Sequence, residues 1–186
     1  MHAENDIHAG AIAVTKSTTL QCLPAHIRSD CRTLVLGSMP GNASLEAGSY
    51  YAHPRNRFWP LMQVLLHIDA GAAYPTRLHT LAERGVGLWD VIGQCERRGS
   101  LDTAIVPGSI VVNPFASLLA TLPQLRAVVC NGAAAAQAWR RHVQPLLPVE
   151  LRAVPLWALP STSPANAAWS LPRLCEAWQP LRAALD

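Results

Sequence analysis

Short apolar runs that alternate with helical patterns constrain the fold of this 186-residue chain most strongly. Residues 33–38 (TLVLGS) and 126–130 (RAVVC) are apolar and rich in β-branched residues, which is typical of buried strands. A turn and a segment with helical spacing follow each run. Strands that alternate with helices form a parallel sheet covered by helices on both faces. The sequence therefore predicts an α/β fold, a three-layer α/β/α sandwich around a mostly parallel sheet of four to five strands.

The remaining elements follow from the same patterns. Strands are expected over residues 87–92, 109–112 and 151–157, and a polar loop is expected over residues 39–53. Pro54 and Pro60 bracket the start of a helix on which Trp59, Met62 and Leu65 recur at helical spacing. Further helices are expected over residues 76–84, 115–122, 133–142 and 170–184, with Thr76 and Ser170 as caps.

Length and composition restrict the class of protein. Residues 21–186 suit a single domain, whereas residues 1–20 are polar and weakly patterned, as in a flexible tail rather than a signal peptide. No apolar run reaches the roughly 18 residues that a membrane span needs. The five cysteines show neither CxxC spacing nor a matching histidine pair, so we expect no metal and no cofactor. The expected protein is a cytoplasmic monomer.

The positive charges limit the chemistry. The net charge of +3 is too small to identify a nucleic-acid binder, and the excess of arginine over lysine can reflect genome composition alone. Lys16 is the only lysine, and it lies with the N-terminal amine in the expected tail. An enzyme that works through a Schiff base needs an amine to form it. A lyase step is therefore not expected, and water is the expected nucleophile.

Three loops follow the carboxyl ends of the predicted strands, where open α/β sheets bind their ligands. Residues 37–41 (GSMPG) begin the first loop, and residues 50–59 (YYAHPRNRFW) follow it. The turn Asn131-Gly132 follows the second strand, and residues 159–166 (LPSTSPAN), here named the late loop, follow the last.

In this order, these motifs resemble the hypoxanthine-DNA glycosylase (DNA-deoxyinosine glycosylase) branch of the uracil-DNA glycosylase superfamily. Residues 85–92 and 99–105 add to a similarity that runs from about Leu34 to the C-terminus. The relatives share an α/β/α sandwich and flip a damaged nucleotide into a pocket between the two motif loops. The resemblance implies a DNA-repair enzyme that hydrolyses the N-glycosidic bond of a deaminated base, hypoxanthine first, and leaves an abasic site.

The first motif departs from most of the superfamily. The uracil- and mismatch-directed branches place Asp or Asn beside its proline, whereas this chain has Met39, which cannot orient water. The hypoxanthine branch shares this departure and uses the asparagine of its HPxN motif, which implies Asn56 as the catalytic residue here. An asparagine carbonyl can position water and face a cationic sugar carbon. Asparagine is also a favoured helix cap, so Asn56 could instead cap the following helix.

The other expected site residues fall into two groups, each with an alternative. His53 could be a turn residue, Asn131 could serve a left-handed turn, and the late loop could be a plain Ser/Thr turn. Tyr51 is favoured for stacking on the base, with Tyr50 in the core. The substrate-binding group is Gly37, Ser38, Met39, Pro40, Gly41, Tyr50, Tyr51, His53 and Asn131. The DNA-binding group is Arg55, Arg57, Ser161, Thr162, Ser163, Pro164 and Asn166.

Several other residues are expected to be structural. Asp90 and Asp102 suit helix caps or ion pairs better than acid–base chemistry, and Arg97 and Arg98 suit a solvated face. Core positions are expected for Trp89, Trp139, Trp157, Trp169 and Trp178.

Other functions remain open at this point. A relative of the same superfamily could prefer uracil or a mismatched pyrimidine, and a noncatalytic DNA-binding module would bind without releasing a base. A serine hydrolase would use Ser38, but residues 37–41 lack the GxSxG pattern of a nucleophile elbow.

Overall fold

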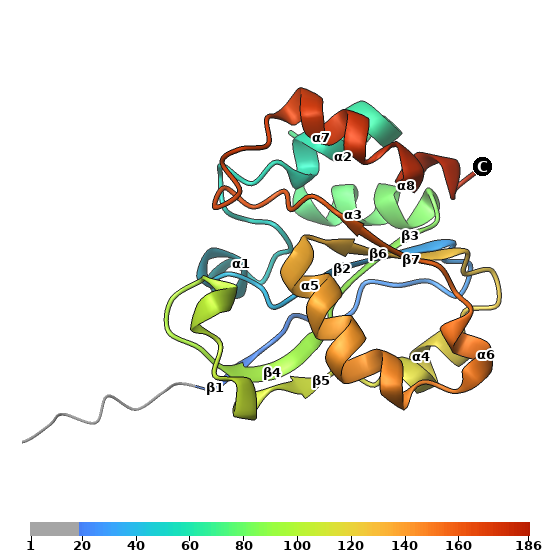
Figure 1. Ribbon diagram of the computed structural model, residues 1–186. Coiled ribbons are helices and arrows are strands. Elements are labelled where there is room, and N and C mark those ends of the chain that lie inside the picture. Colours follow the sequence, from blue (N-terminus) through green and yellow to red (C-terminus); the bar gives the residue numbers. More distant parts are fainter. Residues whose placement is uncertain (1–18) are drawn as a thin grey trace, which may run out of the picture.

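The computed structural model describes residues 19–186, and four parallel strands form its central sheet (Figure 1). Their order is β3 (Val86–Asp90), β2 (Thr33–Gly37), β6 (Ala127–Asn131) and β7 (Leu156–Leu159). The chain moves outward from β2 to β3 on one side and from β6 to β7 on the other. The direction of winding therefore reverses between β2 and β6, and such switch points are where open α/β sheets bind ligands.

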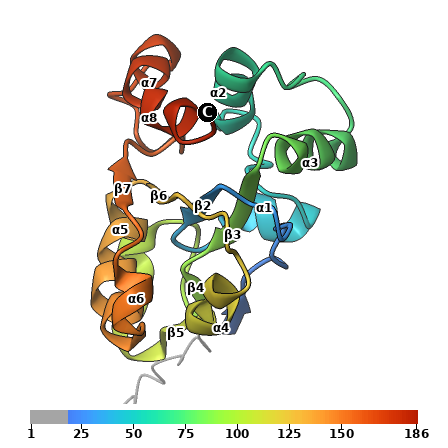
Figure 2. The ribbon, with the colours of Figure 1, turned by 90° about the vertical axis from the view of Figure 1, so that its right-hand side faces the viewer.

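Helices cover both faces of this sheet (Figures 1 and 2). On β2, Val35 faces the core beneath α2 (Phe58–Leu66), α3 (Tyr74–Glu83), α7 (Leu171–Ala177) and α8 (Gln179–Ala183). Leu34 and Leu36 face the opposite core, which α4 (Phe115–Ala120), α5 (Ala133–Ala138) and α6 (Val149–Arg152) cover. Because successive strand residues point to opposite faces, one short apolar strand serves both cores. The predicted three-layer sandwich is confirmed, with four strands in its central sheet.

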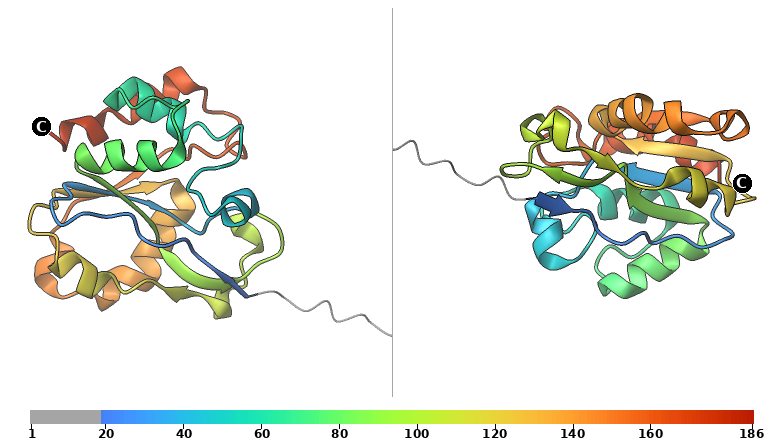
Figure 3. Two further views of the ribbon diagram at one scale, coloured as in Figure 1. Left: turned by 180° about the vertical axis from the view of Figure 1, so that it is seen from behind. Right: turned by 90° about the horizontal axis from the view of Figure 1, so that it is seen from below.

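A second, antiparallel sheet lies beside the first, in contact with the core on the α4 and α5 side (Figure 3). Its order is β1 (Thr19–Gln21), β4 (Ile92–Glu96) and β5 (Val111–Val112). The predicted strand at 109–112 belongs to this sheet, and β4 was not predicted because IGQCE lacks an apolar run. Thr19 and Leu20 pair with Glu96 and Cys95, so the last two residues of the expected tail form a strand. Lys16 and the rest of that tail lie outside the described residues.

Several helices differ from their predicted bounds. Helix α1 (Asn42–Ala47) lies within the predicted first loop and ends at Gly48, whose φ of 57° suits glycine. Helix α3 begins two residues before Thr76, with Pro75 in its first turn. The start of the last predicted strand is helix α6, and the closing helix divides at Trp178. The shorter elements are η1 (Asp102–Ala104), η2 (Pro107–Ser109), the π-helical turn η3 (Trp139–Val143) and η4 (Gln144–Leu146).

None of the helices in residues 19–186 combines the length and the apolar character that a bilayer span requires.

The tryptophans expected in the core differ in how far they are buried. Trp178 and Trp139 are buried, whereas Trp157 packs against the core from a partly exposed position. Trp89 and Trp169 pack in the same partly buried way.

Candidate active site

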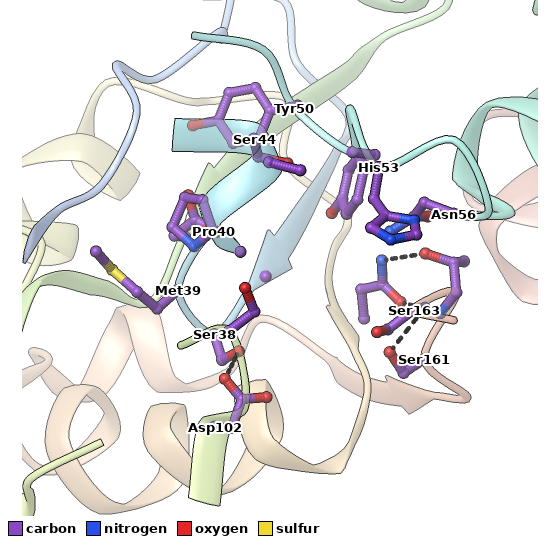
Figure 4. Close-up of a pocket in the computed structure, with 18 of the residues that line it drawn as sticks. Ser38, Met39, Pro40, Ser44, Tyr50, His53, Asn56, Asp102, Ser161 and Ser163 are labelled. Carbon is purple, nitrogen blue, oxygen red and sulfur yellow. Dashed lines mark hydrogen bonds between the residues drawn. The ribbon is translucent and has the colours of Figure 1, made fainter. Parts of the chain in front are cut away.

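A cavity of about 170 Å³ lies at the switch point, beyond the carboxyl ends of β2, β3 and β6 (Figure 4). In Figure 4, Ser38, Met39 and Pro40 lie on one side of it, and His53, Asn56, Ser161 and Ser163 lie on the other. Residues far apart in the sequence thus meet at one edge of the sheet. The lining residues are Gly37, Ser38, Met39, Pro40, Gly41, Ala43, Ser44, Tyr50, Tyr51, His53, Asn56, Asp90, Ser100, Asp102, Asn131, Ser161, Thr162, Ser163 and Pro164.

The cavity contains Asn56 and all nine residues expected to bind substrate. Four of the seven expected DNA-binding residues also line it, and Arg55, Arg57 and Asn166 do not. Sequence reasoning did not assign Ser44, Ser100 or Asp90 to this wall. Asp90 could have been found, because it ends a buried apolar strand on the edge where the other site residues were sought.

Arg97 supports the backbone of the first loop through hydrogen bonds. Its guanidinium donates hydrogen bonds to the carbonyl oxygens of Met39 (3.4 Å) and Pro40, and the residue is only 3% exposed. The expectation that Arg97 lies on a solvated face is therefore wrong, although Arg98 is exposed as expected. Met39 is itself buried, so this loop presents backbone and small side chains to the cavity.

Asn56 lies in the wall opposite the first loop and is partly buried. Its Oδ1 accepts a hydrogen bond from the backbone N–H of Phe58, the first residue of α2, at 3.0 Å. The N-cap position of α2 belongs to Arg57 and has no side-chain cap bond, so the alternative of Asn56 as the helix cap is wrong. A carbonyl oxygen has two lone pairs, and an amide nitrogen has two hydrogens. The bond from Phe58 N–H therefore orients the amide and leaves it further hydrogen-bonding capacity, which is compatible with the predicted catalytic role.

His53 forms a turn, which was its alternative role, and it also lines the cavity. Its Nδ1 accepts a hydrogen bond from the backbone N–H of Arg55 at 3.1 Å, and its carbonyl oxygen accepts one from Asn56 N–H at 2.8 Å. An Nδ1 that accepts carries no proton, so a neutral ring carries its proton on Nε2. The turn therefore leaves His53 with a donor beside Asn56 in the cavity wall.

The two adjacent tyrosines both line the cavity but differ in burial and contacts. Tyr50 is buried and donates its hydroxyl proton to the carbonyl oxygen of Pro24 at 3.0 Å. Tyr51 has a φ of 58° and stacks on Phe58, with ring centroids 3.9 Å apart. One face of the Tyr51 ring is thus already covered, and only the other could meet a base.

Asn131 and Thr162 form a reciprocal pair of hydrogen bonds. Asn131 Nδ2 donates to Thr162 Oγ1, and the backbone N–H of Thr162 donates to Asn131 Oδ1, each at 2.9 Å. Asn131 has no left-handed backbone, so that alternative is wrong; the positive φ of 107° belongs to Gly132. A Cβ on Gly132 would lie 2.8 Å from Ser161 Cβ, so only glycine admits the late loop this closely.

Arg57 has a different role from the predicted phosphate contact. Its guanidinium donates to the carbonyl oxygens of Thr162, Ser163, Asn166 and Trp169, which are all in or just after the late loop. Four carbonyl groups around one cation satisfy its donors and fix the path of an irregular segment. Arg57 therefore positions the loop.

The other residues predicted to contact DNA in this region differ in their positions and hydrogen bonds. Asn166 Nδ2 donates to Ser161 O at 2.9 Å, so Asn166 supports the late loop from outside the cavity. The hydroxyl oxygens of Ser161 and Ser163 accept backbone N–H bonds within the loop, as in a Ser/Thr turn. Arg55 is exposed beside the cavity.

Asp90 is a buried carboxyl group in the cavity wall. It is 3% exposed, and neither carboxyl oxygen forms a hydrogen bond with any described residue. Burial, followed by the negative charge of Asp102, raises the pKa of Asp90 to about 8, and Arg97 opposes the shift. The expected cap or ion pair is wrong for Asp90. Asp102 accepts a 2.6 Å hydrogen bond from Ser38 Oγ, and burial raises the pKa of Asp102 as well.

No group of three His, Cys, Asp or Glu side chains in the described part of the chain is arranged to hold a metal ion. The five cysteines all carry free thiols: Cys22, Cys31, Cys95, Cys130 and Cys175.

Comparison with known proteins identifies the family. The family model described as the Uracil DNA glycosylase superfamily matches residues 24–182. The chain belongs to the uracil DNA glycosylase superfamily. The predicted resemblance is confirmed, and the chain is a DNA glycosylase of this superfamily.

Relatives of this glycosylase come from Methanosarcina. A Methanosarcina acetivorans protein named Hypoxanthine DNA glycosylase is 34% identical over 157 residues, which are 84% of this chain and 93% of the relative. A Methanosarcina barkeri protein of the same name is 37% identical over 113 residues, 60% of this chain and 70% of the relative. A solution NMR structure of a candidate uracil DNA glycosylase from Methanosarcina acetivorans superposes with a TM-score of 0.75 at 30% identity, covering 91% of this chain and all of that one.

Thr162→Val should destabilise the glycosylase by about 1–2 kcal/mol. Thr162 is fully buried, and valine would remove the acceptor of Asn131 Nδ2 at an unchanged side-chain size. Urea unfolding measures the free energy. The matched control is Ser163→Ala, which removes a hydroxyl from the same loop and should cost less than about 0.5 kcal/mol. Equal losses in the two variants would contradict a structural role for the pair.

Asp90→Asn should change how stability depends on pH. Between about pH 4 and about pH 8, folded Asp90 keeps a proton that the unfolded chain releases, so rising pH favours unfolding across this window. The variant lacks this pH-dependent loss of stability, so its stability relative to the unmodified glycosylase should increase over the window, by at most about 6 kcal/mol. Urea unfolding at a series of pH values tests this; a constant difference would contradict it.

Proposed function

We propose that this glycosylase removes hypoxanthine from deoxyinosine in DNA and leaves an abasic site. The observation that carries the proposal is the position of Asn56. Its amide lies in the cavity wall facing the first loop, where Met39 stands in the place of the usual acidic or amide residue. The amide comes from the motif that the hypoxanthine branch uses, and both curated relatives bear the name Hypoxanthine DNA glycosylase.

Asn56 acts by position and electrostatics. Hydrolysis of an N-glycosidic bond builds positive charge on the sugar carbon and negative charge on the base. The free lone pair of Asn56 Oδ1 would hold a water molecule against that carbon, and its negative end would stabilise the developing cation. The bond from Phe58 N–H fixes the amide in advance, so little reorganisation is needed during the reaction.

Access to the cavity requires the nucleotide to leave the duplex. Enzymes that act on a base extrude it, because the reacting atoms are inaccessible within the stack. The late loop suits this task, because Arg57, Asn131 and its own turns hold it rigid against the sheet. Exposed Arg55 and the hydroxyl groups of Ser161 and Ser163 would contact the phosphates on either side of the flipped nucleotide.

The cavity offers polar groups to both edges of a purine. His53 presents Nε2–H, and Asn131 Oδ1 keeps one lone pair after it accepts from Thr162 N–H, whereas the Asn131 amide also interacts with the Tyr51 hydroxyl. A uracil- or mismatch-directed activity is the alternative, and release of hypoxanthine and uracil from paired oligonucleotides distinguishes the two.

The proposed reaction is hydrolytic and needs neither a lyase step nor a metal. A lyase step needs an amine that forms a Schiff base with the abasic sugar, and Lys16 is the only lysine of the chain. The product strand should accordingly remain intact until alkali is added. We propose a monomer as the active form, because one chain supplies every wall of the cavity.

Purified protein should release free hypoxanthine from a deoxyinosine oligonucleotide, and Asn56→Ala should slow release about 10²- to 10³-fold with DNA binding nearly unchanged. The variant loses the positioned amide but no phosphate contact. Single-turnover release and fluorescence anisotropy measure the two quantities.

Two further variants separate catalysis from the hydrogen bond that Asn56 accepts at the start of α2. Asn56→Ser keeps an acceptor for Phe58 N–H and should be as slow as Asn56→Ala despite near-normal stability. Asn42→Ala changes an exposed asparagine outside the cavity and should leave the rate unchanged. Near-normal turnover by Asn56→Ala would refute the mechanism, and DNA binding without release of any base would favour the noncatalytic module.

A further inference from the structure

Asp90 is the one buried carboxyl group that faces the cavity without a hydrogen-bonding partner in residues 19–186. It is the last residue of β3, and it lines the cavity together with Gly37 and Asn131. An isolated buried carboxyl group is costly, and folded proteins usually pair such groups. A partner that arrives only with the substrate would account for this arrangement.

The position of the carboxyl group is tightly fixed. A Cβ on Gly37 would lie 2.5 Å from Asp90 Oδ1, so the carboxyl group packs directly against the glycine of the first motif. Asn113 Nδ2 donates to the Asp90 carbonyl oxygen at 2.8 Å and holds the backbone. The next residue is fixed as well, since Val91 N–H donates to Gly37 O at 2.8 Å. The carboxyl group therefore stays at the cavity.

The surroundings favour a neutral Asp90. Burial and the charge of Asp102 disfavour its ionised form more than Arg97 favours it. The other titratable groups facing Asp90 hold their protons at neutral pH, because burial raises each of their pKa values above the ordinary range. They are Cys22 after β1, Tyr50 and Tyr51 after α1, and Tyr74 on α3. Asp90 is thus a proton carrier in a largely uncharged wall.

We propose that Asp90 is the general acid that protonates the departing purine. This inference rests on the proposed function and names a second catalytic residue, since Asn56 has no proton to give. A purine that leaves with the electrons of its glycosidic bond is an anion, and a cavity with few charges stabilises an anion poorly. Proton transfer as the bond breaks turns the leaving group into a neutral base.

The step balances as a hydrolysis. The water oxygen forms a bond to C1′, the C1′–N9 bond breaks, and its electron pair goes to the purine. The carboxyl proton of Asp90 moves to a ring nitrogen of the purine. The attacking water releases one proton to solvent, and the Asp90 carboxylate takes one up before the next turnover. The net reaction consumes one water and yields hypoxanthine and an abasic site.

The test is the pH profile of single-turnover release from a deoxyinosine oligonucleotide under saturating protein. The wild-type rate should be constant in the neutral range and fall above about pH 8, since only protonated Asp90 is active. Asp90→Asn should be about 100-fold slower or more at pH 7, and its remaining activity should lack the alkaline fall. Thermal melting of the variant confirms that it folds.

Two companion variants test the assignment without removing Asp90. Asp102→Asn removes the negative charge that raises the Asp90 pKa, so its alkaline fall should move to lower pH. Asn56→Ser should lower the rate at every pH and leave the fall where it is, because Asn56 carries no titrating proton.

The outcomes separate this inference from the proposed function. An Asp90→Asn rate within about threefold of wild type would overturn the acid assignment, and so would an Asp90→Asn variant that keeps the alkaline fall. In either case, release of hypoxanthine by the wild type would still support the proposed function. A fall that stays in place in Asp102→Asn would also count against Asp90. A wild-type protein that releases no base would end both proposals.

Discussion

The site depends on a tether between an irregular loop and the end of a strand. After Leu159, the late loop contains no helix or strand, yet it forms one wall of the cavity. Asn131 at the end of β6 binds Thr162 through two hydrogen bonds, and Arg57 satisfies four carbonyl groups of the same segment. Arg57 directly follows Asn56, so the residue that positions the loop also places the proposed catalytic amide next to it.

Two buried ionisable groups shape the opposite wall. Arg97 donates hydrogen bonds to two carbonyl groups of the first loop, whereas Asp90 lacks a hydrogen-bonding partner among residues 19–186. The contrast matters because the energetic cost of a buried group depends on its partners. The arginine stabilises the loop, and the carboxyl group is kept neutral. A cavity with fixed dipoles and a neutral acid suits a reaction that separates charge.

Sequence reasoning found the positions of the site residues better than their contacts. The strands of the central sheet, their parallel direction and the strand-end loops follow from local apolar patterns, and the motifs pointed to Asn56, which lies in the cavity wall. The partners of Arg57 and Arg97 could not be predicted, because a long flexible side chain reaches carbonyl groups that only the tertiary path brings near. Asp90 was missed for a different reason: its strand-end position was visible, but its lack of a partner is a property of the folded state. Helix α1 was hidden by a polar, glycine-containing sequence.

The central claim concerns where the everted nucleotide and the Asn56 amide meet. The most direct measurement is a crystal structure of the protein bound to DNA that contains an uncleavable deoxyinosine analogue. We expect the base in the cavity between residues 37–41 and the late loop, with a water molecule held by Asn56 Oδ1 against C1′. A base bound elsewhere, or an Asn56 amide turned away from the sugar, would contradict it.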